Sequence, residues 1–486
     1  MRTIVALCSF LVTLPAAAQL RSELKMPPPP VPPEPEAAAA PRPGATVRLG
    51  LRDAVERALQ VDPQTLTAVV NRQRSELAVL RAQLDRFSLK VDVNLTEEWQ
   101  AVNFLPTNAI SNPLTGEAYG VSKGFVGQFG AAANLRVPIF AGHKVSASIS
   151  RARNLRDAAA LTEKATARSV ALAMLQSYWA VRRVELQRVV SEQALGRYEE
   201  AVAVVGSRVR AGLAPPVDVN RIETRRQRER ARLAGLEGTA REGRAQLAVA
   251  LGYGGAELEL TEGAEVPAPP AGPGEVDRLL RAAMDARPEL RAARRQTLAA
   301  DDQVKVARST YWPTLTAVAS LSYGNGSGSY GYLYSQFSGS WSANPFKDMG
   351  GAAFLGATLS INLFDTFNTK TQVRDAEYQV ALQRQEERRL GRLVEADVRT
   401  AHARLQRLYA SREPLAKTRD LAKDTLDIIE RRYRNGEALI LDYLDAQFEL
   451  LNSEIDLADS AAAIAQTWGE LWAATGRIPG APGGKP

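Results

Sequence analysis

The strongest constraint on the fold is a long internal repeat. The segment RAGLAPPVDV, which contains Gly212, has a counterpart in RNGEALILDY, which contains Gly436. The segment LRVPIFAG begins at Leu135 and its counterpart LSINLFDT at Leu359, and Pro63 corresponds in the same way to Pro288. Because these anchors keep one order and nearly one offset, the sequence predicts two copies of one long structural unit rather than a short-period solenoid.

The repeat divides the chain into a first unit over residues 48–265 and a second over 275–478, joined by a linker at 266–274. Each unit is expected to open with a helix rich in Ala, Arg, Leu and Gln. Two strands, a very long helix, a turn and a returning helix follow. A short Gly/Pro tail at 479–486 ends the chain.

The N-terminus reads as an export signal. Residues 1–18 combine Arg2, an apolar run and three alanines, which predicts a secretory signal peptide cleaved after Ala18. Residues 19–47 form an arm so rich in proline that we expect an extended, polyproline-type tether. The sole cysteine, Cys8, lies in the signal and lacks the small residue upstream that a lipoprotein cleavage site requires. The mature chain is therefore expected to have no disulfide and no acyl anchor.

Apolar and polar residues alternate in four segments, which predicts strands near 87–104, 125–140, 313–323 and 353–364. Alternation over about ten residues fits a tilted transmembrane β-strand, and it also fits a soluble sheet with one wet face. The polar loops at 105–124 and 324–350 favour the first alternative, because long loops on one side are typical of outer-membrane barrels.

Two segments at 142–211 and 366–435 predict very long helices, followed by returning helices at 216–252 and 440–475. A helix of about 68 residues would be roughly 100 Å long. Apolar residues in the second long helix recur at mixed spacings of three and four, which predicts a seam for another helix. Both a coiled-coil rod and a helical wall fit this pattern. Pro414 predicts a kink or break.

Four strands cannot close a barrel in lipid, because the open edges would leave backbone groups unsatisfied in hydrocarbon. Either the sheet lies outside a membrane, or several chains pool their strands. Two copies would give eight strands and a filled lumen, whereas three would give twelve strands and an open one. The residue pattern is compatible with either number.

The ordered set of features resembles the TolC-type outer-membrane efflux proteins: an export signal, duplicated helix–strand–strand–helix–helix units, the VPIFAG junction and the G-x-x-x-x-x-D turns. The resemblance covers roughly residues 48–478. It implies an α+β membrane protein that forms a homotrimer, with a twelve-stranded transmembrane β-barrel in the lipid of the outer membrane of a Gram-negative bacterium. A long α-helical barrel would continue it through the periplasm. The implied function is the exit duct of a tripartite efflux or type I secretion system, gated at its periplasmic tip and coupled to an inner-membrane transporter through a periplasmic adaptor (membrane fusion) protein.

Two positions in each unit are expected to mark the junctions between strands and helices: Pro138, Phe140, Pro313 and Phe364. Proline is often found at both kinds of junction in the family, whereas each unit here keeps one. Asn362 stands where the first unit has Pro138, and Thr366 stands where it has glycine. We therefore expect the two units to bend differently at this junction.

The turns after the long helices have the sequence chemistry of helix caps. Gly212 and Gly436 follow the last helical turns, and Pro215 and Pro216 precede the first returning helix. By resemblance, these turns form the periplasmic tip of the duct.

Acidic residues open the returning helices. Asp218, Asp442 and Asp445 can interact favourably with the helix dipole, and Asp442 and Asp445 share one helical face. By resemblance, the latter two match a pore-lining acidic pair, while Tyr433 and Asp218 match members of the family's closing network. Ala438 and Val217 replace Arg and Thr of some relatives.

Other function classes find little support in the sequence. No catalytic set stands out, so an enzyme is not expected, and neither a cofactor nor a metal site is predicted for the two histidines, His143 and His402. The formal net charge of +7 is modest and interleaved with acidic residues, so nucleic acid is not an expected partner. The alternative from another class is a soluble periplasmic coiled-coil scaffold or adaptor, which would explain the helices but not the strands.

Overall fold

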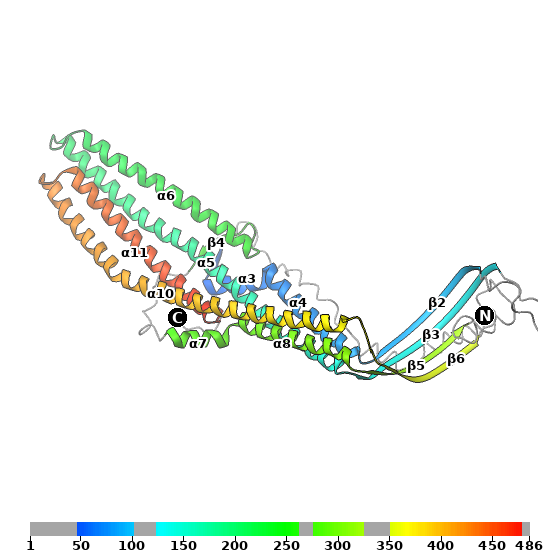
Figure 1. Ribbon diagram of the computed structural model, residues 1–486. Coiled ribbons are helices and arrows are strands. Elements are labelled where there is room, and N and C mark those ends of the chain that lie inside the picture. The colour runs from blue at the N-terminus through cyan, green and yellow to red at the C-terminus, as the bar shows by residue number, and fades with distance from the viewer. Residues whose placement is uncertain (1–45, 102–122, 262–275, 325–349, 479–486) are drawn as a thin grey trace, which may run out of the picture. The chain divides into compact units, whose positions relative to one another are not determined.

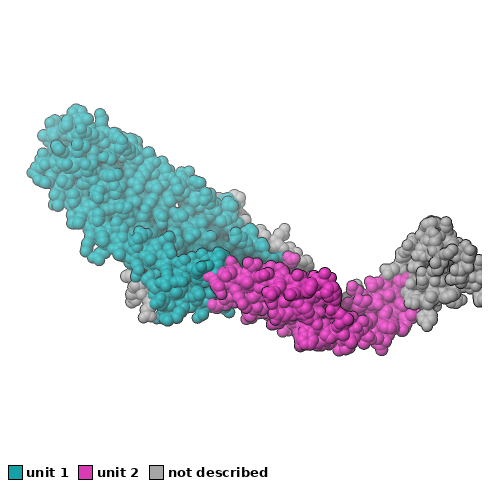
Figure 2. Space-filling model, in the orientation of Figure 1, with its two compact units in different colours: residues 1–73, 159–292, 389–486 teal, residues 74–158, 293–388 magenta. Residues whose placement is uncertain are grey.

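The structure, a computed structural model, describes residues 46–101, 123–261, 276–324 and 350–478. The expected signal peptide, nearly all of the proline-rich arm, the linker at 266–274 and the tail lie outside the described residues, as do most of both interstrand loops. The described chain forms two compact units (Figure 2), which are not the two sequence repeats, since each unit contains segments of both halves. The chain passes from one unit to the other within four of its helices. Unit 1 comprises residues 1–73, 159–292 and 389–486, and unit 2 comprises residues 74–158 and 293–388.

The element order repeats along the chain (Figure 1). The first half contains β1 (Thr46–Leu49), α3 (Leu51–Val61), α4 (Pro63–Leu84), β2 (Ser88–Ala101), β3 (Lys123–Ala141), α5 (Lys144–Arg210), α6 (Val217–Ala250) and β4 (Glu257–Leu260). The second half contains α7 (Val276–Ala286), α8 (Pro288–Arg308), the 3₁₀ turn η1 (Ser309–Tyr311), β5 (Thr314–Gly324), β6 (Gly350–Ser360), α10 (Asn368–Asn435) and α11 (Ile440–Ala474).

Three features differ from the sequence-based expectation. The opening helix of each half is two helices, because Pro63 and Pro288 each begin a new one. β1 and β4 were not expected; they form a parallel pair with Thr46 opposite Glu257. Strands of four residues are too short to show a periodic pattern, and the partner is distant in sequence. Of the kink or break expected at Pro414, the break is wrong, since α10 continues through that residue.

Unit 2 contains a four-stranded antiparallel sheet in the order β2-β3-β5-β6 (Figure 1). β3 continues past the end of β2, because the β2–β3 pairing begins at Ser88 opposite Arg136. Its pairing with β5 runs on to Ala141 opposite Thr314, with a register shift between Pro138 and Phe140. Pro138 therefore does not mark the end of strand pairing, although its missing N–H suggested that pairing would end there. It is tolerated because it lies beside a bulge and beyond the reach of β2.

The strand-to-helix junctions of unit 2 share a backbone conformation that their sequences do not share. Gly142 and His143 both have positive φ angles, of 55° and 66°. The corresponding residues of the second half, Thr366 and Phe367, have φ angles of 53° and 63°. The expectation that glycine and threonine would make different turns is thus wrong at these two residues.

An aspartate caps the helix that follows the second junction. The left-handed conformation costs a non-glycine residue about 1–2 kcal/mol. The Asp365 carboxylate accepts hydrogen bonds from the backbone N–H and the hydroxyl of Thr369, which caps the start of α10. The aromatic contacts also repeat, with Phe140 edge-on to His143 at 6.3 Å and Phe364 edge-on to Phe367 at 6.4 Å. The halves differ instead in strand length: β6 ends at Ser360, before the predicted end of that strand at position 364.

The core of unit 1 depends on small residues, on the buried Arg287 and on the half-buried Arg168. Gly469 of α11 lies so close to α5 that a Cβ there would be 2.0 Å from the Leu175 side chain. Arg168 donates to the Ala473 carbonyl at 2.9 Å, and Arg287 donates to the Ala474 carbonyl at 2.9 Å. These cations satisfy the last carbonyls of α11 and complement its dipole. Glu289 and Asp397 in turn neutralise them.

Within the described ranges, no helix is long and apolar enough to span a membrane.

The first junction gives a stability prediction. A Cβ at Gly142 would lie 2.6 Å from the Trp312 Cβ and 2.8 Å from the Ser309 carbonyl oxygen. Gly142→Ala should therefore destabilise the protein by about 2–4 kcal/mol, through the left-handed φ and the clash together. The exposed helical Gly235 has open space around it, so Gly235→Ala should be neutral or stabilising by about 0.5–1 kcal/mol. Thermal unfolding midpoints compare the two variants, and equal midpoints would contradict the assignment.

Candidate functional site

Both long helices of unit 1 end in the same glycine-capped turn. At the end of α5, Gly212 has a φ of 72° and the Leu213 N–H donates to the Arg208 carbonyl at 2.8 Å. At the end of α10, Gly436 has a φ of 83° and the Glu437 N–H donates to the Arg432 carbonyl at 2.8 Å. These are Schellman caps, in which glycine supplies the left-handed residue. The capping geometry predicted for Gly212 and Gly436 is confirmed.

The returning helices begin with different chemistry. Pro215 and Pro216 precede α6, and Pro216 adopts a helical φ of −58° at the N-cap position. α11 begins after Leu439, whose N–H donates to the Asp442 carboxylate at 3.3 Å. A carboxylate in the first turn satisfies a free backbone donor and complements the positive end of the helix dipole. Asp442 therefore caps its own helix, whatever else it does.

Side chains from all four helix ends meet in one buried apolar cluster, at the end of unit 1 where both turns lie (Figure 1). Its buried members are Tyr198, Ala201, Val205, Ile222, Ala422, Leu426, Tyr433, Ile440, Tyr443, Leu444, Ala446 and Leu450. The two turns are therefore supported by a common core and form one structural site, which we call the helical tip.

Arg208 of α5 joins the two turns directly. Its guanidinium donates to the Leu213 carbonyl of its own turn at 3.3 Å, and also to the carbonyls of Tyr433 and Arg434 in the last turn of α10. Both carbonyls lie in the last turn, where the helix provides few donors, and the Tyr433 carbonyl also accepts from the Gly436 N–H at 3.0 Å. The guanidinium also lies 5.0 Å from the centre of the Tyr433 ring, at cation–π distance. One side chain thus connects both turns through three main-chain carbonyls.

Tyr433 acts in the tip through its ring. The residue is buried and its ring stacks on that of Tyr443, with centroids 5.4 Å apart and planes inclined by 7°. Burial and the negative charge of Asp218 raise the pKa of Tyr433. Its hydroxyl has no hydrogen-bond partner within the described residues. Asp218 and Tyr433 are therefore brought together, as expected, but no hydrogen bond joins them.

Burial and the nearby Glu430 charge raise the pKa of Tyr443 to about 12. The hydroxyls of both stacked tyrosines therefore stay protonated near neutral pH.

The three aspartates occupy two different environments. Asp218 is only 5% exposed, and Arg221 lies 3.6 Å from its carboxylate. Asp442 and Asp445 are exposed on α11, and the Asp445 side chain retains 75% of its accessible surface despite Arg225 at 3.9 Å. Two carboxylates on one helix face remain available to solvent, whereas the third belongs to the tip core.

Sequence reasoning missed Arg208. The other arginine in the last turn of α5, Arg210, is exposed. The helical spacing held a signal for Arg208. Positions 201 and 205 are apolar, and position 208 continues their stripe on the helix at a spacing of three, whereas position 210 does not. That the side chain would reach a second turn, in the other half of the chain, could not be inferred from the sequence.

Known proteins support the same fold. The family model described as Outer membrane efflux protein matches residues 54–253 and 279–477. The outer membrane protein VceC from Vibrio cholerae superposes with a TM-score of 0.70 and 19% identity, over 88% of this chain and 96% of that one. The outer membrane channel CmeC of Campylobacter jejuni gives 0.67 and 14%, over 88% and 85%. The open-state outer membrane channel MtrE of Neisseria gonorrhoeae gives 0.65 and 18%, over 88% and 89%. No curated protein sequence matches significantly.

The bridging role of Arg208 predicts a local loss of protection in its absence. Hydrogen bonds to a charged group contribute about 1.5–3 kcal/mol, so Arg208→Ala should increase amide exchange in both turns by roughly tenfold to a hundredfold. Arg210→Ala, two residues away and exposed, should leave exchange in the second turn unchanged. Hydrogen–deuterium exchange of peptides around Gly212 and Gly436 measures both. If only the first turn responds to Arg208→Ala, the bridge does not hold the turns together.

Proposed function

The chain belongs to the outer membrane efflux protein family, and we propose that three copies of it form the exit duct of a tripartite efflux or type I secretion system. The family model matches both halves of the chain, from residue 54 and again from residue 279, which is the observation that carries the assignment. The protein is thus an efflux channel of the bacterial outer membrane with a periplasmic helical part, and it is a passive channel rather than an enzyme. A soluble scaffold or adaptor is not favoured.

The proposal of three copies rests on the sheet of unit 2. β2 and β6 are its edge strands, and each has one edge without a partner among the described residues. Leu89 on β2 is 66% exposed and Leu355 on β6 is 84% exposed. Lipid contact and pairing with further copies would bury these groups. Twelve strands from three copies enclose an open lumen, whereas eight from two would be filled by side chains.

We infer a gate at the helical tip, where Asp442 and Asp445 face solvent. Three copies would place six carboxylates around one aperture, which favours cations and repels anions. Tyr433 and Asp218 are buried, so their proposed role is to hold the tip in one conformation rather than to line the aperture. The adaptor and the inner-membrane transporter would engage this tip, while outer-membrane lipid would surround the sheet.

Planar-bilayer recording of the purified protein tests the duct and its gate together. The wild type should conduct ions with a preference for cations. Asp442→Asn with Asp445→Asn should reduce the cation-to-anion permeability ratio by at least about threefold, because the Coulombic attraction at the aperture is removed.

The chain offers a matched control in Asp53 and Asp277, which are exposed first-turn acids of α3 and α7. Asp53→Asn with Asp277→Asn should leave selectivity unchanged. A protein that is soluble, monomeric and silent in the bilayer would contradict the duct itself. A conducting protein whose selectivity ignores Asp442 and Asp445 would contradict only the gate.

A further inference from the structure

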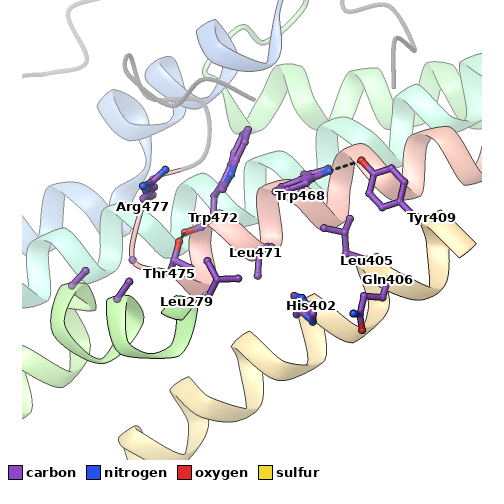
Figure 3. Close-up of a pocket in the computed structure, with 13 residues that line it drawn as sticks. Leu279, His402, Leu405, Gln406, Tyr409, Trp468, Leu471, Trp472, Thr475 and Arg477 are labelled. Carbon is purple, nitrogen blue, oxygen red and sulfur yellow. Dashed lines mark hydrogen bonds between the residues drawn. The ribbon is translucent and has the colours of Figure 1, made fainter. Parts of the chain in front are cut away.

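A cavity of about 590 Å³ lies among α7, α10, α11 and the turn that follows α11, all within unit 1 (Figure 3). We call it the aromatic socket, because Tyr409, Trp468 and Trp472 line it together with His402, Leu471 and Thr475. The Trp468 indole N–H donates to the Tyr409 hydroxyl at 2.8 Å, which fixes two of the rings (Figure 3). The socket is distinct from the helical tip.

The internal repeat identifies the first-half counterpart of this socket. Gly476 has a φ of 88°, and a Cβ there would lie 3.3 Å from the Ala286 Cβ, where α7 ends. Gly252, its counterpart in the first half, has a φ of 72°, and a Cβ there would lie 3.2 Å from Val61, where α3 ends. The same glycine-capped turn thus packs on the same short helix in both halves. The surroundings of these two turns can be compared position by position.

The first-half counterpart is filled rather than empty. Tyr178, which corresponds to His402, is fully buried and belongs to a core cluster that includes Leu49 of β1 together with Leu258 and Leu260 of β4. Its hydroxyl donates to the Leu49 carbonyl at 3.3 Å. Two extended segments therefore cover this position in the first half, and one of them, β1, accepts the hydrogen bond from the Tyr178 hydroxyl.

The sequence of the second half has no counterpart to the two strands that cover Tyr178 in the first half. The positions that correspond to β1 and β4 read AGPG, at 271–274, and APGG, at 481–484, so none of the three leucines has a counterpart. His402 is only 6% exposed, and its Nε2 has no hydrogen-bond partner in the described chain. A buried polar atom without a partner is costly, which indicates that a further group supplies one.

The side chains of the socket have also changed toward aromatic character. Glu185 and Arg244, an ion pair at 3.8 Å in the first half, correspond to Tyr409 and Trp468. Ala248 corresponds to Trp472. Aromatic-lined grooves are the surfaces that bind proline-rich segments in the polyproline II conformation. Such segments present carbonyl acceptors and few N–H donors, so an imidazole with its proton on Nε2 would find an acceptor there.

We propose that the proline-rich arm of this protein, centred on PPPPVPPEPE at residues 27–36, docks as an extended segment in the aromatic socket. The arm joins the fold close to the socket. Val47, at the start of β1, and Ile478 pack against the core cluster that contains Tyr178, and Arg477, next to Ile478, lines the socket. The stretch from Val31 to Thr46 would span roughly 45 Å as polyproline II. Glu34 and Glu36 complement the exposed Arg477. The arm would thus fill in the second half the place that β1 and β4 fill in the first.

Site-directed disulfide formation in the full chain tests this docking. Cys8 is the only cysteine, so a Cys8→Ser background carrying Val31→Cys and Gln406→Cys has a single possible pair within one chain. Gln406 lines the socket and is exposed, so its substitution should not disturb folding. The matched control is Val31→Cys with Arg407→Cys, because Arg407 is exposed, adjacent in sequence and not among the residues that line the socket.

Docking predicts that the Gln406 pair oxidises at least about tenfold faster than the Arg407 pair, because a bound segment has a raised effective concentration at its site. Replacing residues 27–36 other than position 31 by Gly and Ser should abolish this difference, because the tether length is kept and the polyproline conformation is lost. A non-reducing gel measures the rate of disulfide formation in each variant.

A covalent dimer would overturn docking within one chain, because it would place the arm in the socket of a neighbouring copy. Equal oxidation rates at the two positions, or a preference for Gln406 that survives in the Gly/Ser arm, would overturn the proposal altogether.

Discussion

The open edges of a four-stranded sheet set the conditions for the rest of the protein. β2 and β6 are long, and each carries exposed apolar side chains beside a row of backbone groups that the described chain does not pair. Water, lipid or an incorrect partner would otherwise meet these edges. Closure with further copies solves the problem for the sheet. It would also bring the helices of those copies together, and in the proposed duct the exposed acids of the tip would then share one aperture.

Duplication has preserved the backbone more strictly than the side chains. Thr366 keeps the left-handed conformation of Gly142, and Gly436 repeats the cap of Gly212. The surroundings then diverge: an ion pair between Glu185 and Arg244 in one half has become a hydrogen-bonded Tyr409 and Trp468 in the other. The repeated backbone with different side chains allows the second half to bind an extended segment at the position where the first half contains β1 and β4.

Sequence reasoning was most successful where local chemistry decides the structure. The glycine caps, the alternating strands and the long helices follow from residue type and period, and the family match confirms the resemblance that they suggested. It failed where tertiary context decides. β1 and β4 are too short to show a period, α10 tolerates Pro414, and Arg208 reaches a turn that is distant in sequence. Tyr433 was selected correctly, but its ring makes the contacts rather than its hydroxyl.

The central claim is that β2 of one copy pairs with β6 of the next until three copies close a ring. Cysteines at Leu89 and, in turn, at Leu355, Ala357 or Leu359 would test it, because these positions lie on opposite edges of one sheet and cannot meet within a chain. Oxidation of the membrane-embedded protein, analysed on a non-reducing denaturing gel, should convert at least one of these variants to a covalent trimer as the largest product. Products that stop at the dimer, extend beyond the trimer or never exceed one chain would contradict a three-membered ring.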